Sequence, residues 1–194
     1  TIPNFIVHPD IGIGQYTEVD ILGVRFPYRA ELLENTMKDD ELFTKMTKPF
    51  FIIAEVKKDR CRLNEPWKKP SKKNMQRILV ALGAFCHCKI DDIAHQLYED
   101  GFYEDEPYII SLVFVGKRRN PEYFNRYPKV PQITWEEIAK FIYNRFFRYR
   151  DQKLFHNQWD QTGKKIWHFF EQCCEREDGQ QLFIKKIIKR LSSD

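Results

Sequence analysis

No stretch of the 194-residue chain approaches the about 20 apolar residues that a membrane-spanning helix needs. The first residues also lack the pattern of a secretory signal peptide, and we find neither an internal repeat nor a low-complexity segment. We therefore expect one compact core without a membrane segment, and we predict a cytoplasmic location. The chain starts with Thr1 rather than Met, which fits a piece of a longer protein.

Cysteine is scarce, with five residues at spacings that do not form a disulfide framework. Cys86 and Cys88 are one residue apart, and no second pair of cysteines accompanies them as a structural zinc site requires. We interpret them as small buried residues at a helix end and keep zinc binding as the alternative. The odd number of cysteines fits a reducing compartment.

Two common catalytic patterns are also missing. No serine stands in a nucleophile elbow, and no glycine-rich loop suited to phosphates is present. His8 ends an apolar run and is interpreted as a turn residue, while the other four histidines have no partner at ligand or triad spacing. These absences disfavour serine hydrolases and P-loop enzymes.

Basic residues are concentrated in one part of the chain. The net charge is only +4, but residues 48–89 hold eleven Lys or Arg against three acids. Such a local excess of positive charge favours an anionic partner, and a solvated basic face is the alternative interpretation.

The order of apolar patterns is typical of a mixed sheet with helices packed on it. Alternating or continuous apolar stretches predict strands at residues 4–9, 18–27, 50–57 and 108–115. A polar excursion at residues 31–48, with room for a short helix, separates the second strand from the third. We predict the α/β or α+β class, with a mixed central sheet flanked by helices.

Helical spacing follows the third strand and dominates the end of the chain. Ser71 is predicted to cap a helix whose apolar stripe runs through Phe85, and a second helix is expected at residues 90–99. Thr134 and Glu137 have the spacing of a capping box. Two further helices are predicted at residues 161–175 and 180–191. We expect a core of residues 1–130 and a C-terminal helical extension, residues 131–194, packed on that core.

The stretch FFIIAEVKKD, residues 50–59, places charged residues at the end of an apolar strand. Glu55 and Lys57 share one face of this strand, about 7 Å apart. If the strand at residues 18–27 lies beside it, Asp20 approaches Glu55 across the ladder. Two such carboxylates repel each other unless a divalent cation lies between them, and Mg²⁺ prefers one or two carboxylates with waters and phosphate oxygens. A simple ion pair at a strand end is the alternative.

An Asp at the start of one strand and Glu-Val-Lys at the end of the next resemble the PD-(D/E)xK nuclease superfamily. The resemblance covers residues 4–116 and implies a restriction-endonuclease-like fold that hydrolyses phosphodiesters with Mg²⁺, for which Mn²⁺ substitutes. It implies that Asp20 and Glu55 are metal ligands and that Lys57 positions or activates the attacking water. Glu18 is a secondary carboxylate, and Gln76 matches a glutamine that some branches of the family place at the site.

The sequence departs from the family in one respect. Many members carry a further acidic residue on a helix before the first strand, and no such helix precedes Asn4. Either that helix lies outside the given sequence or the core is degenerate. A literal Pro-Asp pair occurs at Pro9 and Asp10, but it precedes a glycine-rich turn, so Asp10 ranks below Asp20.

Basic residues near the motif are suited to holding a polyanion. They surround Trp67, which is suited to stacking on bases, and their positive charges favour phosphate contacts rather than sequence readout. The predicted nucleic-acid-binding residues are Lys58, Lys68, Lys69, Lys72, Lys73 and Arg77.

These features together predict a metal-dependent nuclease. Nucleic acid is the expected partner, with DNA ranked ahead of RNA, and cleavage within the strand or from its end stays open. The alternative is a catalytically inactive nuclease-like domain that binds nucleic acid or docks a protein through its C-terminal helices. A protein partner or a homodimer remains compatible with either function.

Overall fold

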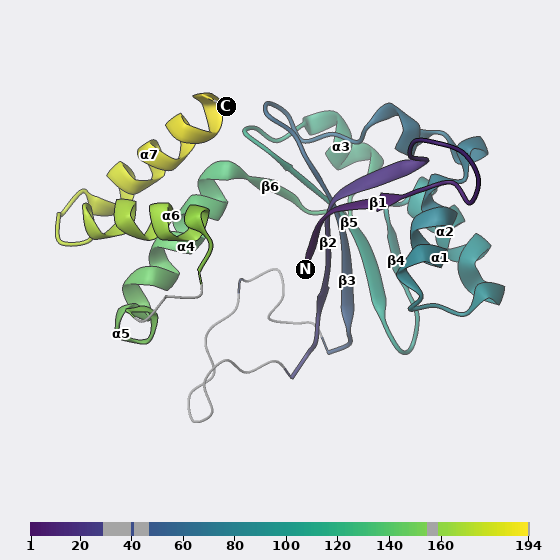
Figure 1. Cartoon of the computed structure of the whole chain (residues 1–194), viewed down its shortest axis with the longest axis horizontal. Coiled ribbons are helices and arrows are strands. Elements are labelled where there is room, and N and C mark those ends of the chain that lie inside the picture. The colour runs from purple at the N-terminus through teal and green to yellow at the C-terminus, as the bar shows by residue number, and fades with distance from the viewer. Residues whose placement is uncertain (29–39, 41–46, 155–158, 194) are drawn as a thin grey trace. The chain divides into compact units, whose positions relative to one another are not determined.

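The computed structural model describes residues 1–28, 40, 47–154 and 159–193. The chain divides into two units, Thr1–Ile133 and Thr134–Asp194, and each is considered by itself (Figure 1). The first unit contains the sheet and the residues of the candidate site. The predicted excursion at residues 31–48 falls largely outside the described residues.

A six-stranded mixed sheet forms the centre of the first unit. Strands β1, β2 and β3 are successively antiparallel, β5 runs parallel to β3, and β4 pairs with β5 in the antiparallel sense. The short strand β6 also pairs with β5. The four predicted strands are therefore confirmed within a few residues, whereas the three-residue strands β4 and β6 were missed. The strands are β1 (Ile2–Val7), β2 (Thr17–Arg25), β3 (Phe50–Val56), β4 (Phe102–Glu104), β5 (Ile109–Gly116) and β6 (Gln132–Thr134).

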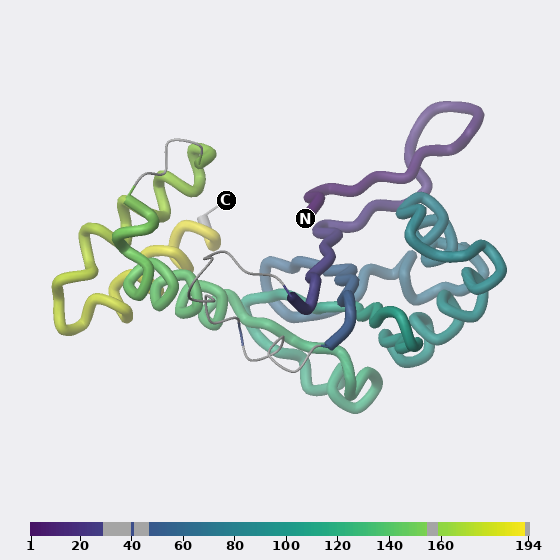
Figure 2. Tube along the Cα trace, turned by 90° about the horizontal axis from the view of Figure 1, so that it is seen from below, coloured from purple at the N-terminus to yellow at the C-terminus, as the bar shows by residue number. Residues whose placement is uncertain are grey.

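Two α-helices, α1 (Asn74–Leu82) and α2 (Ile90–Glu99), pack together on the same side of the sheet (Figures 1 and 2). Their apolar residues join those of the central strands in one buried core, to which Ile53, Ile78 and Ile93 belong. A third helix, α3 (Pro121–Arg126), was not predicted, and its Tyr123 contacts the ring of Phe114 on β5. The predicted α/β architecture, a mixed sheet flanked by helices, is confirmed.

The start of α1 differs from the prediction. Ser71 lies inside a short 3-10 helix, η2 (Pro70–Lys72), which follows another, η1 (Glu65–Lys68). Lys73 takes the N-cap position with a left-handed backbone, φ 54°, so no side chain caps α1. Pro70 begins the η2 turn, and Ser71 is used inside that turn rather than at the boundary of α1. Phe85 is buried as expected, but it lies beyond the end of the helix.

The prediction that Cys86 and Cys88 are buried is wrong. Both are exposed, and their sulfur atoms are paired as a disulfide around the 3-10 helix η3 (His87–Lys89). The buried positions in this segment are Phe85 and Ile90, which flank the cysteines and enter the core. Residues 86–89 therefore face solvent, while Phe85 and Ile90 on either side of them are buried.

The second unit is helical. Thr134 and Glu137 form the predicted capping box at the start of α4, with the Thr134 hydroxyl accepting from the Glu137 N–H and the Glu137 carboxylate accepting from the Thr134 N–H. Tyr143, Trp167, Phe170 and Phe183 fill a separate core. The helices are α4 (Trp135–Arg148), α5 (Arg150–Lys153), α6 (Gln161–Glu171) and α7 (Gly179–Ser193).

In the described ranges, no helix combines the length and apolar character needed to cross a bilayer.

Two glycines that end helices offer a matched test of packing. Gly83 and Gly101 follow α1 and α2 with φ of +65° and +66°, and a Cβ at Gly83 would meet no atom within 4 Å. A Cβ at Gly101 would lie 2.5 Å from Val130 Cγ2. We expect Gly83→Ala to cost about 1 kcal/mol for the left-handed backbone, and Gly101→Ala about 2–4 kcal/mol because overlap is added. Urea unfolding of both variants measures the difference, and equal losses would contradict the packing at Gly101.

Candidate metal and nucleic-acid site

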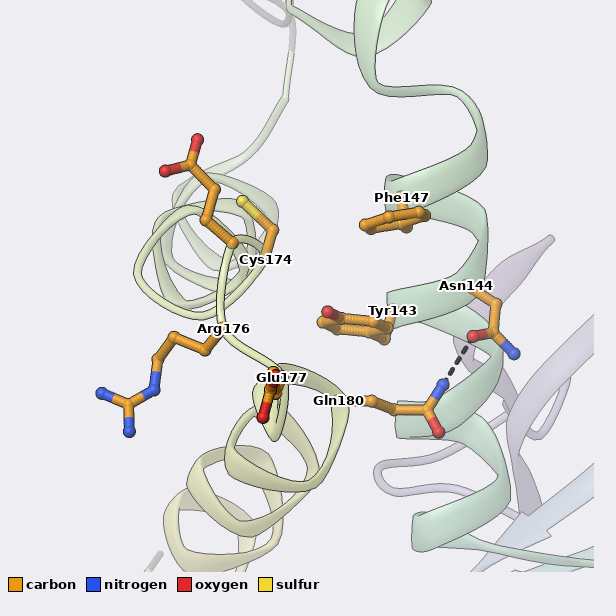
Figure 3. Close-up of a pocket in the computed structure, with 8 residues that line it drawn as sticks. Tyr143, Asn144, Phe147, Cys174, Arg176, Glu177 and Gln180 are labelled. Atoms are coloured by element: carbon orange, nitrogen blue, oxygen red, sulfur yellow. Dashed lines mark hydrogen bonds between the residues drawn. The ribbon is translucent and has the colours of Figure 1, made fainter.

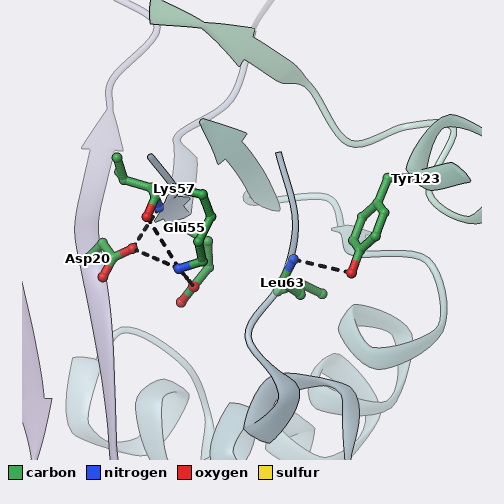
Figure 4. A network of polar contacts seen from close by, with 6 residues as sticks. Asp20, Glu55, Lys57, Leu63 and Tyr123 are labelled. Atoms are coloured by element: carbon green, nitrogen blue, oxygen red, sulfur yellow. Dashed lines mark hydrogen bonds and ion pairs between the residues drawn. The ribbon is translucent and has the colours of Figure 1, made fainter. Parts of the chain in front are cut away.

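Asp20, Glu55 and Lys57 come together where β2 begins and β3 ends (Figure 4). Ile21 pairs with Ala54 in the antiparallel ladder, so the next position brings Asp20 beside Glu55. The Asp20 side chain continues the ladder, because its Oδ2 accepts the Val56 N–H at 2.6 Å. The strand register alone therefore places the two carboxylates together.

Lys57 connects the two acids. Its Nζ lies 2.8 Å from Glu55 Oε2 and 3.6 Å from Asp20 Oδ2, and it also donates to the Val56 carbonyl at 3.3 Å. The Lys57 backbone N–H donates to the Val115 carbonyl at 2.9 Å, which extends the pairing with β5 by one residue. One ammonium thus faces both carboxylates, and it belongs to a residue whose backbone is hydrogen-bonded to β5.

Glu55 is the most enclosed member of the group, with a side chain only 1% exposed. Burial raises the pKa of its carboxyl above the usual range, and the charges of Asp20 and Glu18 raise it further, while the hydrogen bond and the charge of Lys57 lower it. Its Oε1 is buried and has no hydrogen-bond partner among the described residues. A buried oxygen in this state is unusual in proteins, and a water or an ion commonly supplies the missing contact.

The secondary candidates lie at different distances from this group. Glu18 accepts a hydrogen bond from Gln15 at 3.2 Å and acts on Glu55 through its charge. Gln76 donates to Asp91 of α2 at 3.4 Å, and its Oε1 is buried without a hydrogen-bond partner among the described residues. Asp10 is exposed in the β1–β2 loop.

In the part of the chain that the structure describes, no three His, Cys, Asp or Glu side chains are close enough to hold a metal ion together. Asp20 and Glu55 therefore stand as a pair of acids rather than as a closed ligand cage. Such a pair suits an ion that keeps several waters, as Mg²⁺ does.

The predicted binding residues divide into two groups. Lys58, Lys69, Lys72 and Lys73 are exposed, and within the described ranges their ammonium groups have no carboxylate partner. Lys68 pairs with Glu65 at 2.7 Å, and this hydrogen bond raises the pKa of Lys68. Arg77 donates to the Lys72 carbonyl and to Asn74 and covers the ring of Tyr16 at 4.0 Å. The charged groups of Arg77 and Lys68 are thus already engaged in contacts within the protein.

Trp67 does not fit its predicted role, because its side chain is only 2% exposed. It lies in the core of the first unit with Met75 and Leu63. The apolar surface of the indole ring is buried there against neighbours, so it is not available to stack on bases. The prediction of a stacking tryptophan is therefore wrong.

Two basic segments that follow the ends of β3 and β5 are paired with each other, and the sequence did not predict this pairing. Residues 57–62 follow β3 and residues 117–120 follow β5, and they are joined by hydrogen bonds from the Cys61 N–H to the Arg118 carbonyl and from the Arg118 N–H to the Asp59 carbonyl, both 2.9 Å. They approach so closely that a Cβ at Gly116 would lie 2.8 Å from the Cys61 nitrogen. The runs KKDRCR and GKRRN are visibly basic in the sequence, but their pairing follows only from the parallel register of β3 and β5.

A hollow of about 560 Å³ lies in the second unit (Figure 3). Its walls include Tyr143 and Phe147 from α4 and Cys174 and Arg176 from the segment before α7, and Gln180 donates to Asn144 at 2.6 Å beside it. None of the predicted site residues lines this hollow. It offers no alternative position for the chemistry predicted from residues 20–57.

No protein-family model matches the chain, and no curated protein or solved structure is significantly similar to it.

Proposed function

We propose that this protein is a metal-dependent nuclease that hydrolyses phosphodiester bonds, with DNA as its expected substrate ahead of RNA. The observation that carries the proposal is the group of Asp20, Glu55 and Lys57 at one end of the sheet, with Lys57 Nζ within 4 Å of both acids. Exposed lysines nearby supply the positive charge that a polyanion requires.

The residues of the group fit a divalent cation. Glu55 has a buried Oε1 without a partner among the described residues, and its negative charge is disfavoured by burial and by Asp20. A hard cation with oxygen ligands would relieve both conditions, so Asp20 and Glu55 would hold Mg²⁺, or Mn²⁺ in its place. When bound, such an ion polarises a phosphoryl oxygen and lowers the pKa of a coordinated water.

Lys57 has the role of orienting the attacking water and offsetting the charge that grows on the phosphate. Its ammonium has three N–H donors. It donates to Glu55 Oε2 at 2.8 Å and to the Val56 carbonyl at 3.3 Å, and it lies 3.6 Å from Asp20 Oδ2. In the proposed reaction the water oxygen bonds to phosphorus, the ester P–O bond breaks, and the leaving oxygen takes up a proton. The water loses a proton to solvent or to a neighbouring base.

We also propose that the sheet is restriction-endonuclease-like. The support is that the acid on β2, the Glu-x-Lys pair at the end of β3 and the helix α1 after them occur in the order that the sequence resemblance implies. The parallel strand β5, placed next to β3, completes the arrangement.

One observation favours a second candidate, a nuclease-like domain that binds nucleic acid without cutting it. Lys57 already pairs with both acids, so the charges of the group are partly balanced by the protein itself. In that case the protein would bind DNA in a salt-sensitive manner but would not cleave it in Mg²⁺ or Mn²⁺.

Incubation of supercoiled plasmid DNA with the protein in Mg²⁺, in Mn²⁺ and in EDTA separates the two candidates. We expect cleavage with either metal, none in EDTA, and a loss of at least about 10³-fold in Asp20→Asn, because a ligand is weakened and a growing charge is left unbalanced. Asp100→Asn, an exposed acid at the end of α2, is the matched control and should cleave normally. Full activity in Asp20→Asn would reject the nuclease site, and salt-sensitive binding without cleavage would support the second candidate.

A further inference from the structure

The loop between β1 and β2, residues 8–16, presents two isoleucines to solvent. Ile11 is 92% exposed and Ile13 is fully exposed. They alternate with Gly12 and Gly14, whose φ values are +104° and +115° and whose added Cβ would meet no atom within 4 Å. Figure 2 shows this loop standing away from the rest of the first unit. Two large apolar side chains exposed almost completely at one tip form a surface that a binding partner could cover.

The base of this loop is fixed. The Tyr16 N–H donates to the Val7 carbonyl at 2.8 Å, and His8 Nδ1 donates to the Gly14 carbonyl at 2.9 Å. The guanidinium of Arg77 lies over the Tyr16 ring at 4.0 Å and so ties the loop to α1. Because its ends are already held, the loop loses little conformational freedom when its tip binds a partner.

The loop projects from the end of the sheet that carries the candidate site. Tyr16 precedes Asp20 by four residues, which span about 13 Å along a strand. Lys72 and Lys73 stand at the start of α1, next to Arg77, and are exposed without a carboxylate partner in the described chain. The base of the loop is therefore bordered by positive charge, because Arg77 contacts both the Tyr16 ring and the Lys72 carbonyl.

We propose that this loop is an apolar wedge that inserts Ile11 and Ile13 at a base step of duplex DNA while Lys72 and Lys73 contact the flanking phosphates. Aliphatic wedges that partly unstack a base step are a known means of gripping the minor groove of DNA. Single strands are gripped instead by aromatic side chains, and one face of Tyr16 is already covered by Arg77. The inference rests on the proposed function for the choice of DNA, and on the loop itself for the mode of binding.

The reach of the wedge is limited by the chain. Five residues from Tyr16 to Ile11 add at most about 17 Å, so the tip lies within about 30 Å of Asp20, or about nine base pairs of duplex. An unstacked step should therefore occur within that distance of the cleaved bond.

Binding of a short duplex that carries 2-aminopurine at successive positions tests the wedge, with Ca²⁺ in place of Mg²⁺ to slow cleavage. We expect the wild-type protein to raise the fluorescence at one step, and Ile11→Ser combined with Ile13→Ser to abolish that rise and weaken binding about tenfold or more. The salt dependence of binding should stay unchanged in this variant, because phosphate contacts remain. Lys72→Gln combined with Lys73→Gln should instead lower the salt slope by about two.

Ile2→Ser is the matched control, since Ile2 is half exposed at the far end of β1, and it should bind as the wild type does. Equal duplex affinity and fluorescence in the double isoleucine variant would overturn the wedge. Sedimentation with anionic phosphatidylserine vesicles that depends on the two isoleucines, with DNA binding unaffected, would assign the loop to a membrane surface and would also overturn it.

The outcomes separate this inference from the proposed function. If the wild-type protein unstacks DNA but cleaves none in Mg²⁺ or Mn²⁺, the nuclease proposal fails and the wedge stands. If it cleaves DNA but the double isoleucine variant binds and unstacks normally, the wedge fails alone. Absence of any duplex binding at low salt would reject both.

Discussion

Replacement of Glu55 by Gln should abolish metal-dependent cleavage and yet make the metal-free protein more stable at neutral pH. The loss of cleavage, at least about 10³-fold, follows from removal of a charged metal ligand. The gain in the free energy of unfolding, about 1 kcal/mol, follows because the variant no longer buries a charge in a side chain that is 1% exposed. Plasmid cleavage and urea unfolding in EDTA measure the two effects on the same sample.

The pH dependence identifies Glu55 as the source of this gain. Because its pKa is raised in the folded state, the carboxyl takes up a proton more readily in the folded protein than in the unfolded chain. Its favourable contribution is complete below the ordinary carboxyl pKa and is lost as the pH rises through the raised value. The stability difference between Glu55→Gln and the wild type should therefore widen from about pH 4 to neutral pH. A difference that does not change with pH, or a less stable variant at pH 7.5, would contradict the burial of an unfavourable charge.

Mg²⁺ adds a second readout for the same variant. An ion that binds only the folded protein at about 100 times its Kd stabilises it by about 2.7 kcal/mol. We expect Mg²⁺ to raise the Tm of the wild type and to leave that of Glu55→Gln nearly unchanged. An equal rise in both proteins would place the bound ion elsewhere.

Replacement of Lys57 by Met should have the largest effect on stability, a loss of about 3–5 kcal/mol at pH 7.5. The methionine fills similar space but leaves the buried Glu55 carboxylate without the ammonium that now lies 2.8 Å away. The loss should shrink as the pH falls toward 5, because Glu55 loses two interactions that lower its pKa and becomes protonated more easily. Urea unfolding across this range measures the change.

Lys58→Met is the matched control for this prediction. Lys58 is the next residue and is exposed, so its replacement should change stability by no more than about 0.5 kcal/mol. Mg²⁺ should restore part of the stability lost in Lys57→Met, since a divalent cation between the acids replaces the missing charge. A variant as stable as the wild type in EDTA would show that Lys57 and Glu55 do not depend on each other in the folded protein.

The sequence was sufficient for the parts of the structure that repeat a simple period. The apolar run at residues 50–57 and the alternation at residues 18–27 predicted the strands β3 and β2. The expectation that consecutive strands pair with each other then put Asp20 beside Glu55 and Lys57, and the structure shows this pairing. The capping box at Thr134 likewise followed from two residues at a fixed spacing.

The features that the sequence did not predict correctly all depend on contacts between residues that are distant in the sequence. Nothing near Trp67 in the sequence shows that its ring enters the core beside Met75 and Leu63. The use of Ser71 inside a 3-10 turn depends on the fold of the whole segment before α1. The short strands β4 and β6 have too few residues to show an alternating apolar pattern. They form because their backbones pair with β5.

Gly116 carries a constraint that extends beyond its own position. Any larger residue there would push against the backbone at Cys61 and Arg60, and would part the two chain segments that continue β3 and β5. Since Lys57 begins one of those segments, the spacing between its amine and the two acids depends on a residue that bears no functional group. Sequence variation at this position should accordingly be as restricted as at the acids themselves, for reasons of steric exclusion alone.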